Sequence, residues 1–235
     1  FILSAHQVDY THMKKAPEEF RFAAMAVDAV VLGFVAGKLC ALVSRVDRPP
    51  HYVNVPGFLG GLVGAQETAE QACARVLHEK GNLKKVYLEQ LYTFSAVDRD
   101  KRNRVVSVAY LGLVRPDTAA SYDHETASFV PVETLKKLAY DHDDMLSIAL
   151  TRLKGKLSYT TMAQFLLPRH FTLSELQAVY EIILKKEFDK RNFRKKILAL
   201  DIVKDTGTTQ EGVKNRPAAL YEFTSQKLKE LPLLT

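Results

Sequence analysis

The stretch FLGGLVGAQETAEQACARVLHEKGNL, residues 58–83, constrains the fold more than any other part of this chain. It begins as a short apolar strand punctuated by glycines. Its apolar residues then follow one face of a helix, at i, i+3, i+4, i+7 and i+8. These are Ala69, Ala72, Cys73, Val76 and Leu77. We therefore expect a strand, a loop and a helix over residues 68–80 whose apolar face packs on a sheet.

The rest of the first half predicts further strands. Two β-branched runs, residues 26–34 and 38–46, are joined by VAGK, a hairpin signal. Residues 86–96 and 104–114 predict another pair, with the charged turn DRDKRN between them expected in solvent. Residues 45–57 predict a proline-rich loop, and residues 129–139 a short strand followed by the start of a helix. This pattern indicates a mixed α+β domain.

The composition is that of a folded globular protein. Of 235 residues, 47% are hydrophobic and 26% charged, and no apolar run approaches the roughly 20 residues that span a bilayer. The first residues do not resemble a signal peptide. Cys40 and Cys73 lie in apolar patterns without metal-ligand spacing, which predicts buried free thiols. We expect a cytoplasmic protein without a membrane partner.

The pattern changes near residue 140. Residues 142–157 predict a helix with acidic residues at its start and basic residues at its end, which suits the helix dipole. His142 is expected to be a structural contact at the start of this helix. We therefore divide the chain into an N-terminal tail (1–20), a mixed α+β domain (21–139), a linker helix (140–157) and a mostly helical domain (158–235).

The last domain carries a local excess of positive charge. Residues 185–196 hold seven Lys and Arg against two Asp and Glu, within a formal net charge of +6 for the chain. Thr172 and Glu175 have capping-box spacing before one helix, and Asp189 is a candidate N-cap for a second, basic helix. Residues 201–223 then predict a two-stranded wing. This order indicates a winged helix-turn-helix that binds double-stranded DNA in the major groove.

The candidate DNA-binding residues are polar or basic. Arg pairs with guanine edges, Asn with adenine, and Lys with phosphates. The candidates are Lys190, Arg191, Asn192, Arg194, Lys195 and Lys196 in the second helix and Lys214 and Arg216 in the wing.

The opening stretch resembles the Nudix signature, with Gly61, Glu67, Arg75 and Glu79 in register. In that family three acids at spacing i, i+3, i+4 hold the metal, and here those positions are Val76, Glu79 and Lys80. Mg²⁺ requires oxygen ligands, which Val76 lacks. A cation about 4 Å away would oppose it by about 4 kcal/mol at an effective dielectric of ~20. We therefore expect no metal, no other cofactor and no catalytic residue.

Taken with residues 138–160, 166–184, 189–198 and 215–223, the chain resembles the Nudix-related transcriptional regulators. The resemblance implies a Nudix-like mixed-sheet α/β/α sandwich followed by a winged helix-turn-helix, assembled as a homodimer. It also implies a ligand-responsive regulator. One branch represses NAD-biosynthesis genes and is released by ADP-ribose or related nucleotides, and another responds to arabinose and controls sugar catabolism.

The effector, an ADP-ribose-like nucleotide or a pentose, is expected beside Gly60, Gly61, Arg75 and Glu79, with Lys80 supplying positive charge. Arg45 and Arg104 are further candidates. Two alternatives stay open. One is a Nudix hydrolase acting on ADP-ribose or a related nucleoside diphosphate, and the other is a module whose basic helix binds an acidic protein. Three properties stay open at this point: the identity of the effector, the operator sequence, and whether the protein represses or activates its genes.

Overall fold

The computed structural model describes residues 22–211 and 217–232. The expected tail, residues 1–20, and the wing candidates Lys214 and Arg216 lie outside the described residues.

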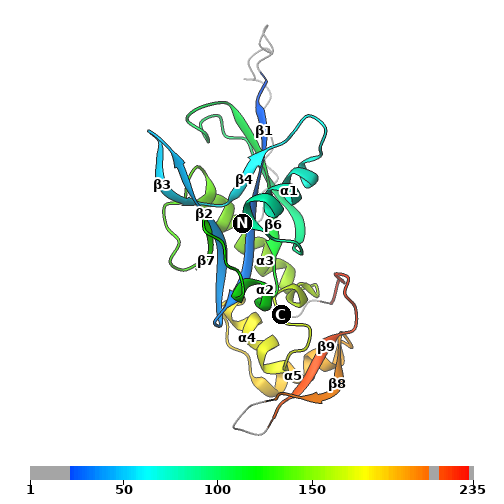
Figure 1. The fold of residues 1–235 in the computed structure, drawn as a ribbon. Helices are drawn as coiled ribbons and strands as arrows, with labels where there is room; N and C mark the ends of the chain where they lie inside the picture. The colour runs from blue at the N-terminus through cyan, green and yellow to red at the C-terminus, as the bar shows by residue number, and fades with distance from the viewer. Residues whose placement is uncertain (1–21, 212–216, 233–235) are drawn as a thin grey trace.

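A seven-stranded mixed sheet forms the first half (Figure 1). Its main order is β3-β2-β1-β6-β5, while β4 pairs with β1 and β7 pairs with β2. Only β1 and β6 run parallel; the other pairs are antiparallel. The strands are β1 (Ala24–Val35), β2 (Lys38–Arg48), β3 (Tyr52–Gly57), β4 (Leu59–Leu62), β5 (Tyr87–Phe94), β6 (Val105–Leu113) and β7 (Ala127–Pro131).

Helices cover both faces of this sheet. Helices α1 (Ala69–Gly81) and α2 (Pro116–Ala120) lie on one face, and α3 (His142–Leu157) lies on the other. The alternation of β1 explains both interfaces, because successive side chains of a strand point to opposite faces. Val27, Ala29 and Val31 enter the α1 side, whereas Val30, Leu32 and Phe34 enter the α3 side. The predicted mixed-sheet α/β/α sandwich is confirmed.

Helix α1 forms where the sequence predicts it. Thr68 caps its first turn through a reciprocal pair of hydrogen bonds with Gln71, and Asn82 ends it in the left-handed conformation. Its buried face includes Ala72, Cys73 and Val76. Cys40 and Cys73 are both free and buried, as predicted.

Two predictions of secondary structure are wrong, and two short helices were missed. Residues 52–57 form strand β3 rather than part of a loop, because β3 pairs with β2 through contacts such as Val46 with Val55. No helix starts within residues 133–139, where turns lead instead to α3. The short helices α2 and η2 (Met162–Phe165) were not predicted, since five or four residues are too few to show a helical period.

The second half is the predicted winged helix-turn-helix. Helix α4 (Leu173–Leu184) begins with the Thr172–Glu175 capping box and ends at Lys185 in the left-handed conformation. Helix α5 (Lys190–Ala199) is capped by Asp189. Strands β8 (Val203–Thr209) and β9 (Ala219–Phe223) form the antiparallel wing.

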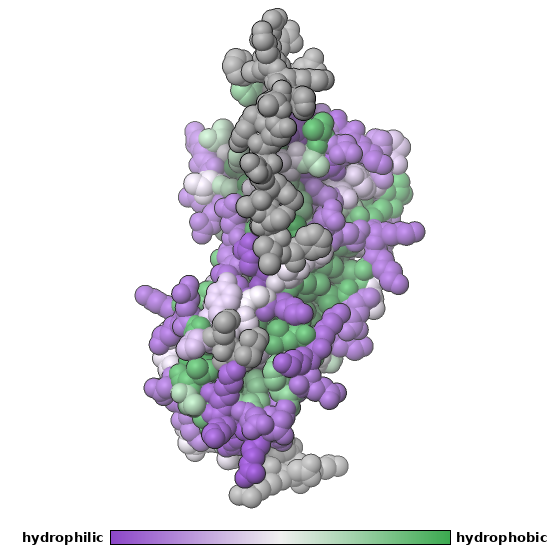
Figure 2. Space-filling model, turned by 180° about the vertical axis from the view of Figure 1, so that it is seen from behind, coloured by the Kyte–Doolittle hydropathy of each residue, from purple (hydrophilic) through white to green (hydrophobic). Residues whose placement is uncertain are grey.

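One hydrophobic core joins the two halves. It runs from the α3 face of the sheet, through Leu153 and Leu157 of α3, to Leu176 of α4 and Phe193 of α5. Figure 2 shows the reverse side, where hydrophilic residues cover much of the surface and hydrophobic residues gather at mid-height. None of the helices within the described ranges is long and apolar enough to cross a membrane.

Candidate functional site

Strand β4 and helix α1 form the first candidate site, and two glycines allow them to approach closely. Gly60 pairs with Asp28 of β1, and a Cβ added at Gly60 would lie 2.0 Å from Asp28 Oδ1. A Cβ added at Gly61 would lie 2.8 Å from Val76 Cγ2 of α1. Strand β4 is therefore enclosed between a helix on one side and a carboxylate on the other, and larger residues would not fit.

Arg75 fastens the loop between β4 and α1. Its Nε lies 3.0 Å from Glu67 Oε2, its Nη1 lies 3.3 Å from Glu79 Oε2, and its Nη2 donates to the Leu62 carbonyl at 3.1 Å. Glu67 also accepts a hydrogen bond from the Gly64 amide at 2.7 Å. The Arg75 hydrogen bond, with that of Gly64, lowers the pKa of Glu67 to about 2. The guanidinium is therefore largely occupied by groups of the protein itself.

Lys80 and Val76 lie on α1 at two of the three positions where the resemblance implies carboxylates. Lys80 Nζ donates to the Gly60 carbonyl at 2.6 Å, so an ammonium group lies against β4. Val76 is only 1% exposed and contributes methyl groups to the core under α1. The third position, Glu79, has a side chain 54% exposed and contacts Arg75.

The other two effector candidates lie apart from these contacts. Arg45 is exposed on β2 and donates to Asn54 Oδ1 at 2.8 Å. Arg104 donates to the Ala96 carbonyl at 3.1 Å, in the connection from β5 to β6. Within the described residues neither has a hydrogen bond or ion pair to the β4–α1 site, and their role in binding stays a prediction.

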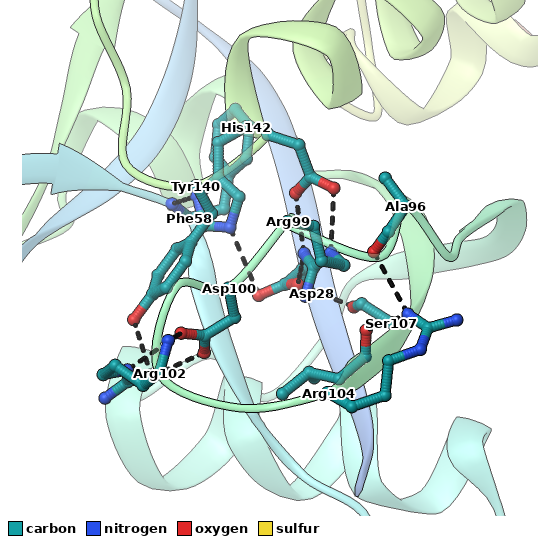
Figure 3. A network of polar contacts seen from close by, with 12 residues as sticks. Asp28, Phe58, Ala96, Arg99, Asp100, Arg102, Arg104, Ser107, Tyr140 and His142 are labelled. Carbon is teal, nitrogen blue, oxygen red and sulfur yellow. Dashed lines mark hydrogen bonds and ion pairs between the residues drawn. The ribbon is translucent and has the colours of Figure 1, made fainter. Parts of the chain in front are cut away.

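A buried polar cluster surrounds Asp28 of β1, the strand that pairs with β4 (Figure 3). Asp28 accepts a hydrogen bond from Ser107 Oγ at 2.6 Å and lies 3.3 Å from Arg99 Nη2. Arg99 also makes two hydrogen bonds, of 2.8 and 2.7 Å, to Asp141 at the start of α3. Burial raises the pKa of Asp28, but His142, Ser107 and Arg99 lower it by more, so the carboxyl stays ionised.

This cluster corrects the prediction of a solvated turn at residues 98–103. Arg99 and Asp100 are both 7% exposed, because Arg99 reaches Asp28 and Asp141, and Asp100 accepts hydrogen bonds from Arg102. The signal that could have revealed it is Asp28 itself, a lone acid inside the apolar run AVDAVVLGF. A buried carboxylate needs a partner, which indicates that a basic side chain from another segment must reach Asp28.

His142 makes the structural contact expected at the start of the linker helix, and it does so with a backbone amide group. Its Nδ1 accepts a hydrogen bond from the Phe58 amide at 2.9 Å, and its Nε2 lies 3.5 Å from Asp28 Oδ1. The imidazole is 1% exposed, which excludes contact with a ligand in solvent.

Helix α5 presents the second candidate site. Phe193 and Ile197 are buried against the core, which turns the remaining residues outward. The six candidates of this helix, Lys190, Arg191, Asn192, Arg194, Lys195 and Lys196, are all exposed. The side chains of Lys190, Arg191 and Lys195 make no hydrogen bond or ion pair to another described residue. A row of available cations on a capped helix beside a wing is the arrangement that contacts a DNA groove.

Comparisons with known families assign both halves. A match to the NUDIX domain covers residues 23–148, and a match to the NrtR DNA-binding winged helix domain covers residues 163–223. This chain belongs to the Nudix-related transcriptional regulators.

Individual relatives match this chain over different shares of its length. The ADPR responsive transcriptional repressor NtrR of Acinetobacter baylyi is 35% identical over 86% of this chain and 82% of its own length. The crystal structure of Shewanella oneidensis NrtR with a 27mer DNA is 30% identical, with a TM-score of 0.76, over 85% of this chain and 93% of its own. An ADP-ribose pyrophosphatase of Methanocaldococcus jannaschii is 29% identical over 52% of this chain and 70% of its own length.

The regulators match this chain over nearly its whole length, whereas the hydrolase matches about half of it. Among residues 22–211 and 217–232, no group of three His, Cys, Asp or Glu side chains is placed to hold a metal ion.

Proposed function

We propose that this chain is a homodimeric, DNA-binding transcriptional repressor that responds to ADP-ribose or a closely related nucleotide. Residues 21–139 bind the effector, residues 140–157 link the two functions, and residues 158–235 bind operator DNA. The effector assignment is supported by the name of the Acinetobacter relative, and the DNA assignment by the DNA complex of the Shewanella protein.

The observation that carries the proposal is the outward basic face of α5. The side chains of Lys190, Arg191 and Lys195 have no hydrogen bond or ion pair to another described residue, so their charges are available for phosphates and base edges. Because a two-fold operator is bound by a two-fold protein, a dimer is the expected assembly.

The effector domain is proposed to bind without hydrolysing. Val76 has no side-chain oxygen for a metal and is packed into the core, and the Lys80 ammonium lies 2.6 Å from the Gly60 carbonyl. The residues present therefore do not fit a Mg²⁺ ion, and metal-activated attack of water on a diphosphate has no support here.

Lys80 is proposed to bind the effector's phosphates. An ammonium group has three donors, and the Gly60 carbonyl takes one of them. The remaining two can contact an anion beside Gly60 and Gly61. Arg75 and Glu79 shape the same site by fixing the loop, since Arg75 already binds Glu67 and Glu79. Arg45 and Arg104 are retained as further candidates.

A thermal-shift panel of ADP-ribose, NAD, nucleotides and pentoses tests the effector. A ligand present at 100 times its Kd adds about 2.7 kcal/mol to stability, which shifts the melting temperature measurably. Stabilisation by a pentose and not by ADP-ribose would assign the chain to the sugar-responsive branch instead. Lys80→Ala should abolish a shift caused by an anionic ligand.

DNA binding is tested with a duplex selected from a random-sequence library. The logarithm of the binding constant should fall with that of the salt concentration, by about 0.9 per phosphate contacted. Adding ADP-ribose should weaken the complex. Binding of the duplex that is independent of Arg191 and Arg194 would favour the alternative in which α5 binds an acidic protein.

The hydrolase alternative is tested by incubating the protein with ADP-ribose and Mg²⁺. We expect no appreciable cleavage. Turnover near 1 s⁻¹ or above, within the ordinary range for enzymes, would overturn the non-catalytic assignment.

A further inference from the structure

The segment that enters β4 is bonded directly to the segment that enters α3. The Ala139 amide donates to the Pro56 carbonyl at 2.8 Å, and the Phe58 amide donates to His142 Nδ1 at 2.9 Å. Phe58 immediately precedes β4, which carries both glycines of the candidate effector site. The strand expected to touch the effector is thus one hydrogen bond from the first residue of the linker helix. We call residues 56–58 and 139–142 the joint.

The joint leaves no room for a side chain at Gly57. A Cβ added at Gly57 would lie 3.1 Å from His142 Nδ1 and 2.7 Å from Val46 Cγ2. The rings of Phe58 and His142 stack, with centroids 5.2 Å apart and planes 22° from parallel. Because close-packed interiors transmit displacement rather than absorb it, a shift of residues 56–58 must move the start of α3.

The entry to α3 takes its conformation from these contacts and not from local preference. Lys137 and Tyr140 have φ angles of 56° and 55°, which L residues adopt at a cost unless their surroundings hold them. Asp141 is held by two hydrogen bonds from Arg99, which also contacts Asp28 opposite the effector strand. Two sets of contacts, one from each side, therefore determine how α3 begins.

We propose that His142 is the positioning residue that couples the effector site to the winged helix. This inference rests on the proposed function. An effector bound beside β4 moves residues 56–58, the Phe58 amide carries that movement to His142, and α3 carries it to the winged helix through their shared core. A ligand shifts an equilibrium only through a difference between two states, and the joint supplies a contact in which the states can differ.

The test is His142→Leu in the full chain. Leucine fills the joint with an apolar side chain and removes the acceptor of the Phe58 amide. Two quantities are measured: the Kd of ADP-ribose without DNA, and the Kd of a library-selected duplex with and without saturating ADP-ribose. We expect each separate affinity to stay within about threefold of wild type, while the ratio of the two duplex Kd values falls close to 1.

Two further variants make the result specific. His142→Asn, whose side-chain oxygen can accept the Phe58 hydrogen bond, should restore most of the ratio. Lys154→Ala, an exposed cation on the same helix, should keep the wild-type ratio.

A wild-type ratio in His142→Leu overturns the inference. If His142→Leu shows no cooperative melting transition, Gly57→Ala replaces it, because its added Cβ separates the same joint, and a wild-type ratio there overturns the inference equally. If the wild-type protein itself shows a ratio of 1, the proposed effector response fails first. That outcome is seen before any variant is made, so the two failures are distinguishable.

Discussion

The cations of the effector domain and those of α5 are used in opposite ways. Arg75 is bound by Glu67, Glu79 and the Leu62 carbonyl, and Lys80 by the Gly60 carbonyl. On α5, by contrast, most of the basic side chains extend from the helix into solvent. The fold therefore already uses donors of Arg75 and Lys80, whereas it leaves the side chains of Lys190, Arg191 and Lys195 open to a partner, although the sequence presents all of them simply as Lys and Arg.

Arg194 is an intermediate case in this contrast. Arg194 is exposed on α5, yet its Nη2 donates to Tyr221 Oη at 3.3 Å. Arg194 therefore links α5 to strand β9 of the wing, and it also adds to the positive charge of the winged helix.

The largest expected effect is on DNA binding, after removal of two outward cations. Arg191→Ala/Lys195→Ala should weaken a selected duplex by at least ~1–3 kcal/mol, or about 5- to 150-fold, since a base-edge contact alone is worth that much. Thermal stability should change by no more than about 0.5 kcal/mol, as for other surface substitutions. Fluorescence anisotropy and thermal melting measure the two quantities.

The matched control for this prediction is Lys84→Ala/Lys85→Ala. It removes the same charge from an exposed connection between α1 and β5. An equal loss of DNA affinity in both double variants would mean that net charge, and not the face of α5, drives binding.

A smaller effect, on the stability of the fold, is expected from adding a side chain at Gly60 in the β4–α1 site. Gly60→Ala should destabilise the fold by ~1–3 kcal/mol in urea denaturation, because its Cβ would lie 2.0 Å from Asp28 Oδ1. Gly155→Ala is the control. Its Cβ meets nothing within 4 Å on α3, so it should stabilise the protein by about 0.5–1 kcal/mol through helix propensity. Loss of stability in both variants would refute the specific role of Gly60.

The smallest effect is a pH dependence of the Glu67–Arg75 contact. Because the pKa of Glu67 is lowered from 4.5 to about 2, its contribution is complete above pH 4.5 and lost as the pH falls toward 2. The melting temperature of wild type should therefore exceed that of Glu67→Gln at pH 6, and the two should converge near pH 2. Glu125→Gln removes a similar charge from an exposed loop and should differ little from wild type at either pH. A difference for Glu67→Gln that persists at pH 2 would argue against the ion pair.

Features with local causes could be predicted from the sequence. Helices α1, α4 and α5 begin at Thr68, Thr172 and Asp189 because each cap bonds an amide only three residues away. The apolar periodicity of the same segments then identified the buried faces.

Features with distant causes could not be predicted in the same way. The burial of Arg99 depends on Asp28, 71 residues earlier, and strand β3 depends on its pairing with β2. Likewise, the proximity of Lys80 to Gly60 follows from the approach of α1 to β4. The sequence identified Lys80 as unsuited to a metal ligand but did not place its ammonium group on a backbone carbonyl.

The hydrogen bond from Arg194 to Tyr221 has a consequence for how regulation can operate. It joins α5 to the second strand of the wing, and Phe193, Ile197 and Phe223 pack in one core beneath it. We therefore expect α5 and the described part of the wing to move together when an effector binds. In a dimer, the quantity that remains adjustable is the separation of two such bodies along the DNA axis. The effector would then change the spacing between operator half-sites that the protein can bind. A duplex with one base pair inserted at its centre should therefore show a different change in Kd on addition of ADP-ribose from that of the original duplex.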